Sequence, residues 1–310
     1  MRMTTFKDFR DKWQGMPERK NSYLSIGEIN SLVFQIGYGS NGLKSFVIMN
    51  SGIVEDALSS LAIKVENPQL GDGSRALLFQ LMQDTFDEEF QHLCWDMVGS
   101  TINATNPLHS LICRYKSWQK LLQYYKNNTM TFERQKGLLG ELLYFQELLD
   151  AHDIMYALHS WCGPDGADQD YIFENSWAEI KTIALSGDRV KISSLEQLKQ
   201  EHNGMMILYV LESSTLGVNR ISLSETVAKI HSILSEDAVA LDLFEMKLFK
   251  YGYRIKDEEE YKKHYFRFIE KREYLVDENF PKLIRDNVPA EVQTCKYELS
   301  LPALETYRRK

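Results

Sequence analysis

The sequence predicts a mixed α/β (α+β) protein built from more than one compact unit. Short β-type runs separated by glycine turns fill the first part of the chain, and helical spacings alternate with β-type runs after it. A length of 310 residues leaves room for two or three domains of ordinary size. We expect an N-terminal β-rich α+β domain over residues 1–125, a central core over 126–215, and a C-terminal α+β extension over 216–310 that packs on the core.

Composition narrows the class of protein before any motif is considered. The chain carries 36 Lys and Arg against 44 Asp and Glu, a net charge of −8, which disfavours broad adhesion to nucleic acid or anionic lipid. The opening residues are charged and no apolar run approaches the roughly 18 residues of a membrane span, so we expect a cytoplasmic protein. No metal-ligand or disulfide spacing relates the four cysteines, which are Cys94, Cys113, Cys162 and Cys295.

The N-terminal domain is expected to contain a small sheet followed by helices. Its β-type runs are separated by turn signals such as Asn41-Gly42. The runs cover residues 31–36, 45–50, 58–65 and 75–82. Apolar residues then recur with helical spacing over Asp87 to Val98, and again around Trp118 to Tyr125.

The central core is expected to have the element order α-β-β-β-α-β. The first helix has apolar residues on one face, the second and third strands form a hairpin, and the second helix begins with serines suited to an N-cap. These elements are expected at residues 133–150, 153–161, 171–173, 177–183, 194–202 and 205–211. The C-terminal extension is expected to contain helices at 224–234 and 239–250 and β-type stretches near 265–276 and 292–301.

The hairpin contains the residues that point to chemistry. Side chains alternate along a strand, so Glu179 and Lys181 share one side of it. Asp170 opens the preceding strand, and pairing across the turn brings its carboxylate near Glu179. Two converging carboxylates repel each other unless one is protonated or a cation lies between them, and Mg²⁺ is a cation that carboxylates and water hold well. The competing interpretation is a surface hairpin with an ordinary Glu–Lys pair.

Two further residues would complete a hydrolytic site. The ammonium of Lys181 can position or help deprotonate a water molecule, or neutralise charge in a phosphoryl transition state. Glu141 falls on the apolar stripe of the helix predicted at 133–150, where a carboxylate needs a partner. The alternative for Glu141 is an edge position from which its carboxylate reaches solvent.

These residues resemble the PD-(D/E)XK nuclease superfamily, and more narrowly the bacterial PD-(D/E)XK motif proteins of restriction or phage-defence operons. The resemblance covers roughly residues 114–300 and implies a restriction-endonuclease-like α-β-β-β-α-β core with a mixed sheet. It implies a metal-dependent endonuclease acting on DNA with Mg²⁺, or with Mn²⁺ in its place. The stretches that carry it are Lys136-Gly-Leu-Leu-Gly-Glu-Leu, Trp161-Cys-Gly-Pro-Asp-Gly-Ala-Asp-Gln-Asp-Tyr, Ala178-Glu-Ile-Lys-Thr, Ser193-Ser-Leu-Glu-Gln and Val276-Asp-Glu-Asn-Phe-Pro.

The resemblance also implies roles for individual residues. Asp170 and Glu179 correspond to metal ligands, and Lys181 corresponds to the catalytic lysine. Glu141 corresponds to the helix acid that binds a metal directly or through water, and Gln197 to a glutamine that some branches place near the site. Asp165 and Asp168 compete with Asp170 for the first ligand position. Asp170 is preferred because Gly166 and the lack of β-type residues place the other two in a loop.

A nuclease also needs cations that meet phosphate groups. A basic stretch leads into the helix of Glu141, the run 262–272 interleaves aromatic residues with cations, and two cations follow the hairpin. The nucleic-acid contacts expected from the first stretch and from the hairpin are Lys116, Lys120, Lys126, Arg134, Lys136, Arg189 and Lys191. By resemblance, an ATPase or recognition subunit of a defence system is the expected partner, and a homodimer is compatible with it. The alternative function is a catalytically inactive nuclease-fold scaffold or nucleic-acid-binding subunit.

Overall fold

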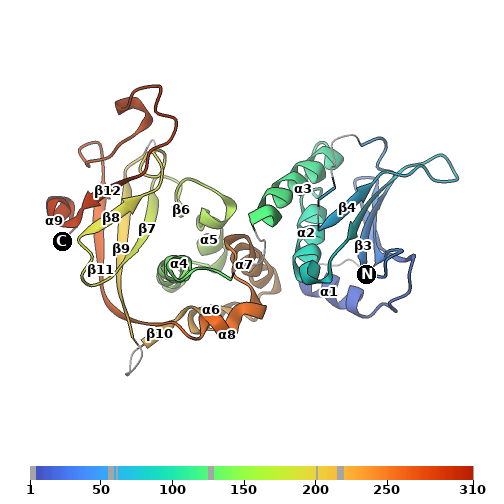
Figure 1. Cartoon of the computed structure of the whole chain (residues 1–310), viewed down its shortest axis with the longest axis horizontal. Coiled ribbons are helices and arrows are strands. Elements are labelled where there is room, and N and C mark those ends of the chain that lie inside the picture. The colour runs from blue at the N-terminus through green and yellow to red at the C-terminus, as the bar shows by residue number, and fades with distance from the viewer. Residues whose placement is uncertain are drawn as a thin grey trace. The chain divides into compact units, whose positions relative to one another are not determined.

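The chain forms two compact units, Met1–Asn127 and Asn128–Lys310 (Figure 1). The computed structural model describes residues 5–54, 59–60, 62–124, 129–199, 202–214 and 220–309, with the backbone alone over 120–124 and at 256. No helix in these ranges is long and apolar enough to cross a membrane.

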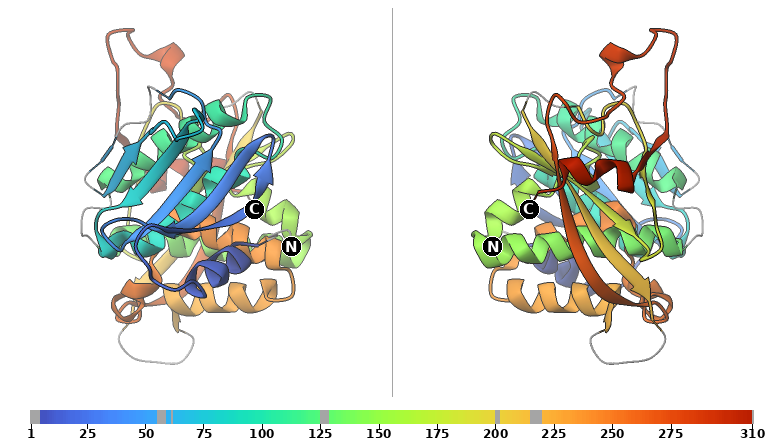
Figure 2. Two further views of the ribbon diagram at one scale, coloured as in Figure 1. Left: turned by 90° about the vertical axis from the view of Figure 1, so that its right-hand side faces the viewer. Right: turned by 90° about the vertical axis from the view of Figure 1, so that its left-hand side faces the viewer.

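The N-terminal unit is an antiparallel sheet with helices on one face (Figures 1 and 2, left). Its described strands follow the order β1-β2-β3-β5-β4. Packing between sheet and helices includes Phe79 of β5 against Tyr115 of α3, with ring centroids 4.8 Å apart. The elements are α1 (Phe6–Gln14), β1 (Ser22–Ile29), β2 (Leu32–Tyr38), β3 (Lys44–Met49), β4 (Ile63–Glu66), β5 (Ala76–Leu81), α2 (Asp87–Gly99) and α3 (Pro107–Tyr124).

The C-terminal unit is built on a mixed sheet. Its described strands follow the order β10-β11-β9-β7-β6, in which only β7 and β9 are parallel among the described pairs. The long strands β9 and β11 run side by side in Figure 2, right. The strands are β6 (Tyr171–Ile172), β7 (Trp177–Ile183), β8 (Arg189–Ile192), β9 (Gly204–Ser213), β10 (Arg220–Ser222), β11 (Tyr265–Val276) and β12 (Tyr297–Ser300). Residues 216–310 therefore contribute strands to the same sheet as the hairpin.

Each face of this sheet has its own hydrophobic core. Ala178 and Ile180 of β7 face the helices, whereas Trp177 and Ile183 face the side that carries the small β8–β12 sheet (Figure 1). The alternation expected for β7 is therefore present, and Glu179 belongs to the second side. The helices are α4 (Phe132–Ala151), α5 (Ile154–Ser160), α6 (Leu223–Leu234), α7 (Ala238–Tyr251), α8 (Glu258–Tyr261) and α9 (Leu301–Leu304).

Two elements of the expected core order are wrong. The segment expected as a strand at 153–161 is α5, because the Asp153 side chain accepts a hydrogen bond from Tyr156 N (2.8 Å) and caps a helix that buries Ala157 and Leu158. The helix expected at 194–202 is absent from its described part, 194–199, which forms bends and a turn. The described order from α4 to β9 is thus α-α-β-β-β-β and not α-β-β-β-α-β.

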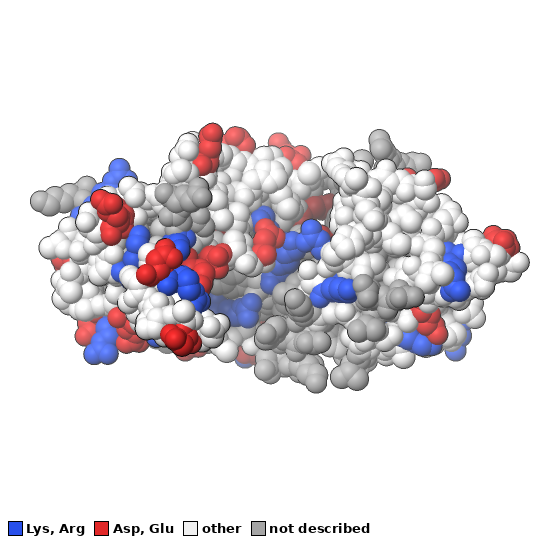
Figure 3. Space-filling model, turned by 90° about the horizontal axis from the view of Figure 1, so that it is seen from above, with Lys and Arg blue, Asp and Glu red and all other residues white. Residues whose placement is uncertain are grey.

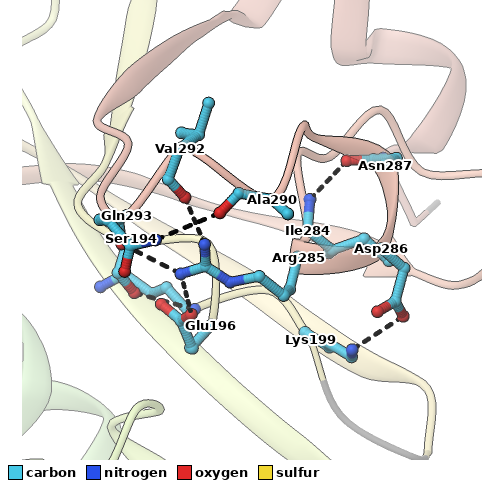
Figure 4. A network of polar contacts seen from close by, with 11 residues as sticks. Ser194, Glu196, Lys199, Ile284, Arg285, Asp286, Asn287, Ala290, Val292 and Gln293 are labelled. Atoms are coloured by element: carbon cyan, nitrogen blue, oxygen red, sulfur yellow. Dashed lines mark hydrogen bonds and ion pairs between the residues drawn. The ribbon is translucent and has the colours of Figure 1, made fainter.

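Polar side chains hold the 194–199 segment in its turn conformation. Gln197 Oε1 accepts from Ser193 N (2.8 Å), and the buried Gln169 amide donates to the carbonyl groups of Glu196 (2.9 Å), Gln197 and Lys199. On its outer side, the segment meets residues 284–293 through the ion pairs Arg285–Glu196 (3.3 Å) and Lys199–Asp286 (2.8 Å) (Figure 4). The bonds from Gln169 satisfy backbone carbonyl groups that a helix would have used for its own hydrogen bonds.

Close packing of α4 on β7 predicts the effect of a change at Gly140. A Cβ added there would lie 2.4 Å from Thr182 Cγ2 and 3.5 Å from Ile180 Cγ2. We expect Gly140→Ala to lower the free energy of unfolding by about 1 to 3 kcal/mol, although alanine favours a helix. Urea denaturation measures this change. Adding Thr182→Ser removes the clashing methyl and should restore most of the loss, whereas wild-type stability in Gly140→Ala would contradict the packing argument.

Candidate active site

The site lies where the edge of β7 is left open. The edge strand β6 pairs with β7 only at Tyr171–Ala178 and Ile172–Trp177. Beyond Ala178, the Ile180 N–H donates to the Asp170 carboxylate, at 2.8 Å to Oδ2. Side chains from both faces of the sheet can approach each other around such an edge, since no further strand separates them there.

Asp170 is held by its backbone as well as by its carboxylate. Its carbonyl oxygen accepts hydrogen bonds from Cys162 N (2.8 Å) and Gly163 N (3.0 Å). A Cβ added to Gly163 would lie 3.0 Å from Asp170 Oδ1 and 3.2 Å from Glu141 Oε2. The two acids therefore border the same small space beside Gly163, and a glycine keeps that space open.

Glu141 reaches this space from the helix face of the sheet. It is 5% exposed, and its Oε2 accepts a hydrogen bond from the indole N–H of Trp161 at 2.8 Å. The Tyr251 hydroxyl also hydrogen-bonds to the Glu141 carboxyl. Glu141 therefore lies on the buried side of α4, and the alternative of a carboxylate that reaches solvent is excluded.

Glu179 and Lys181 complete the group from the other face of the sheet. Lys181 Nζ lies 2.7 Å from Glu179 Oε1, and the side chains are 16% and 1% exposed respectively. The second oxygen of Glu179, Oε2, is buried and has no hydrogen-bond partner. The pair is therefore not the exposed surface pair of the competing interpretation, and it leaves one carboxylate oxygen available to a ligand.

The pKa values of all three carboxyl groups are raised. Burial is the largest cause for each, and the charge of Asp170 adds to it for Glu141 and Glu179, whose pKa values rise well above the ordinary value. Burial also raises the pKa of Asp170 to about 6, although Lys181 and the Ile180 N–H oppose the rise. Like charges held in one buried place favour protonation or a bound cation.

The other acids considered for the first ligand position lie elsewhere. Asp165 forms ion pairs with Lys247 (2.6 Å) and Lys250 (2.7 Å) of α7. Burial alone would raise the pKa of Asp165, but these two lysines lower it. Asp168 is exposed. Gln197 uses its side-chain oxygen within its own turn, and none of the hydrogen bonds described for it joins it to the carboxylates.

The expected nucleic-acid contacts are spread over both units. Lys116 lies in the N-terminal unit, the side chain of Lys120 is not described, and Lys126 lies outside the described residues. Among the residues in the C-terminal unit, Arg134 lies over the Tyr251 ring (5.4 Å), Lys136 is half-buried with a lowered pKa caused by burial, and Arg189 lies 3.5 Å from Glu298. Lys191 is exposed on β8.

The aromatic and basic run at 262–272 has a different character. Its Lys and Arg side chains pair with acids, as in Lys263–Glu260, Arg267–Glu212 and Arg272–Glu270. Positive and negative side chains also alternate over much of the C-terminal unit on the face shown in Figure 3. Paired charges of this kind contribute little to the attraction of a polyanion.

The residues that support the acids were not predicted from the sequence. Trp161 and Tyr251 hydrogen-bond to Glu141, Gly163 borders it, and Lys247 holds Trp161 and Asp165. Tyr251 and Lys247 come from α7, more than sixty residues beyond the hairpin, so no local spacing could identify them. Trp161 and Gly163 lie within the stretch 161–171 that carries the family resemblance, but no chemical role was expected for either residue.

A divalent cation fits the donor set. The carboxylates of Glu141, Asp170 and Glu179 are the oxygen ligands that Mg²⁺ and Mn²⁺ prefer, and Glu179 Oε2 is a buried oxygen without a hydrogen-bond partner. Within the described ranges, no three His, Cys, Asp or Glu side chains are already arranged as ligands. The observed arrangement therefore has the right groups, and each of the three carboxylates also has a donor of the protein bonded to it.

PD-(D/E)XK proteins typically have a mixed sheet with two acids and a lysine at one strand edge. An acid from a neighbouring helix joins these residues. Residues 11–302 match the model of a family described as "Putative PD-(D/E)XK family member, (DUF4420)". The chain belongs to this family. No curated protein and no solved structure matches it.

The raised pKa of Asp170 predicts how a neutral side chain changes stability. The pKa of Asp170 is about 6 in the folded protein and 3.8 ordinarily. Protonation of Asp170 therefore stabilises the fold fully below about pH 4, and this contribution is lost as the pH rises through 6. We expect Asp170→Asn to raise the melting temperature in EDTA by about 5 °C at pH 7.5, and by much less at pH 4. Differential scanning fluorimetry measures both.

The matched control for this prediction is Asp168→Asn, which removes an exposed carboxylate two residues away. It should leave the melting temperature nearly unchanged at both pH values. A gain for Asp170→Asn that is equal at pH 4 and pH 7.5, or a loss at pH 7.5, would show that carboxylate repulsion is not the cause.

Proposed function

We propose that this protein is a metal-dependent endonuclease that hydrolyses phosphodiester bonds in DNA. The observation that supports the proposal best is the convergence of Glu141, Asp170 and Glu179, from three separate elements, on one buried place beside Lys181. A structural role would not require three acids to share a site at the cost of their mutual repulsion. Membership of the PD-(D/E)XK family agrees with it.

In this proposal the acids hold the cation and Lys181 faces the substrate. Asp170, Glu179 and Glu141 would hold Mg²⁺ or Mn²⁺. When bound, the ion would polarise the phosphate and make a water molecule more acidic. Lys181 is more exposed than Glu179, at 16% against 1%, so its ammonium can reach a scissile phosphate. There it orients the attacking water and neutralises the charge that develops on the phosphate oxygens.

Charge suggests how the protein meets its substrate. A chain of net charge −8 should bind duplex DNA weakly alone. We therefore propose that productive cleavage depends on a partner, an ATPase or recognition subunit of a restriction or phage-defence system. The N-terminal unit, which contains none of the four site residues, is the part proposed to dock it.

One observation favours a second candidate, a nuclease-fold subunit that binds DNA or a partner without cleaving. Trp161 and Ile180 donate to two of the acids, and the described residues contain no preformed set of three ligands. The two candidates differ in whether the purified chain or its complex cleaves DNA, and the next experiment separates them.

Changes at the acids and the lysine should abolish cleavage. We expect Asp170→Ala and Lys181→Ala each to reduce Mg²⁺-dependent cleavage of duplex DNA by at least about a hundredfold, since the first removes a ligand of the proposed cation and the second removes positive charge at the reacting phosphate. A gel assay of plasmid nicking, with melting temperature as a check of folding, measures this. Lys263→Ala, an exposed lysine that Glu260 neutralises, is the control that keeps the site intact. Undiminished cleavage by the Asp170→Ala, Lys181→Ala double variant would falsify the assignment.

Cations without an ion-pair partner should carry the contact with DNA. Replacing both Lys136 and Lys191 by alanine should lower the slope of log affinity against log salt by about 1 to 2, because each phosphate contact contributes about one counterion. Fluorescence anisotropy with a labelled duplex at several salt concentrations measures the slope. Lys263→Ala serves as the comparison, since Glu260 neutralises that lysine, and an equal effect of both changes would exclude the assigned contacts.

A further inference from the structure

Helix α7 presents one face to the loop that precedes Asp170. Lys247, Lys250 and Tyr251 are spaced by three and four residues, so they share that face. Lys247 and Lys250 pair with Asp165, and Tyr251 hydrogen-bonds to the Glu141 carboxyl. All three contacts are made to the carboxylate site or to the segment leading into it.

Lys247 is the most enclosed of these residues. Its side chain is 5% exposed, and its ammonium donates to the carbonyl oxygen of Trp161 at 2.5 Å and to Asp165 Oδ2 at 2.6 Å. A buried ammonium is costly unless it is paired and hydrogen-bonded, and these two acceptors meet that need. Lys250 differs because its side chain is more exposed, at 14%, and it pairs with the other oxygen of Asp165.

The segment that Lys247 holds is joined to both acids. The Trp161 indole donates to Glu141 Oε2 (2.8 Å), while the next two backbone N–H groups, of Cys162 and Gly163, donate to the Asp170 carbonyl (2.8 and 3.0 Å). A displacement of the Trp161 backbone would therefore move the donor of Glu141 and the support of Asp170 together.

We propose that Lys247 is a positioning residue for the metal-binding carboxylates, acting through the Trp161–Asp165 segment and not by contact with metal or substrate. This inference rests on the proposed function, because it assigns the carboxylates to a cation. Residues that orient the ligands of a metal commonly change its affinity by about 10- to 100-fold when they are replaced. Lys247 thus makes the C-terminal third of the chain a part of the site.

The test compares Lys247→Met, Lys247→Arg and the matched control Lys250→Met. Isothermal calorimetry with Mn²⁺ alone measures affinity, and the indole N–H signal of Trp161 in an NMR spectrum, assigned with Trp161→Phe, reports its bond to Glu141. We expect Lys247→Met to weaken Mn²⁺ binding by about 10- to 100-fold and to shift the indole signal. Lys247→Arg retains donors for both acceptors and should recover most of the affinity, and Lys250→Met should change both readouts little.

The outcomes separate this inference from the proposed function. Unchanged Mn²⁺ affinity and an unmoved indole signal in Lys247→Met would overturn the positioning role while the metal site stands. Absence of Mn²⁺ binding in the wild-type chain would overturn the metal site, and the indole signal would still decide whether Lys247 controls the Trp161–Glu141 bond. If Lys247→Met does not fold, Asp165→Asn loosens the same contact from its exposed end, and wild-type values of both readouts there would overturn the inference.

Discussion

The burial of three carboxylates in one place is the constraint on which the rest of the C-terminal unit depends. Burial raises the pKa values of Glu141, Asp170 and Glu179, and the charge of Asp170 raises those of the two glutamates further. Donors of the surrounding structure offset part of the cost of burying these charges: the Trp161 indole for Glu141, the Ile180 N–H for Asp170 and the Lys181 ammonium for Glu179. Among these three acids, one buried carboxylate oxygen has no donor, and it is Oε2 of Glu179. A cation site requires such a free oxygen.

The shortness of β6 makes this arrangement possible. A longer edge strand would pair with β7 beyond Ala178 and cover the N–H of Ile180. The chain instead turns back through the 161–170 segment, and Asp170 takes the place of the missing strand. That segment is held by α7 on one side, through Lys247, and by the 194–199 turn on the other, through Gln169. Its conformation is therefore decided by elements distant in sequence.

Much of the fold follows from local patterns. The hairpin, the α4 helix, the two helices α6 and α7 and the strands β9 and β11 all stand where periodicity placed them, because their apolar faces match the cores they contact. The exceptions show where local patterns compete. Asp153 caps a helix where β-type residues indicated a strand, and Ser193 with Gln197 closes a turn where serines indicated a helix start.

The sequence by itself determined that Glu179 and Lys181 share a side of one strand, that Asp170 begins its partner, and that Glu141 lies on a buried stripe, since strand and helix periods are local properties. Only the tertiary structure decided that these four side chains meet, that the side-chain oxygen of Gln197 closes a turn, and that α7 supports the site through Lys247 and Tyr251. The reason is physical: a hydrogen bond or a shared buried charge between residues eighty positions apart leaves no periodic trace in either segment, and is set by packing alone.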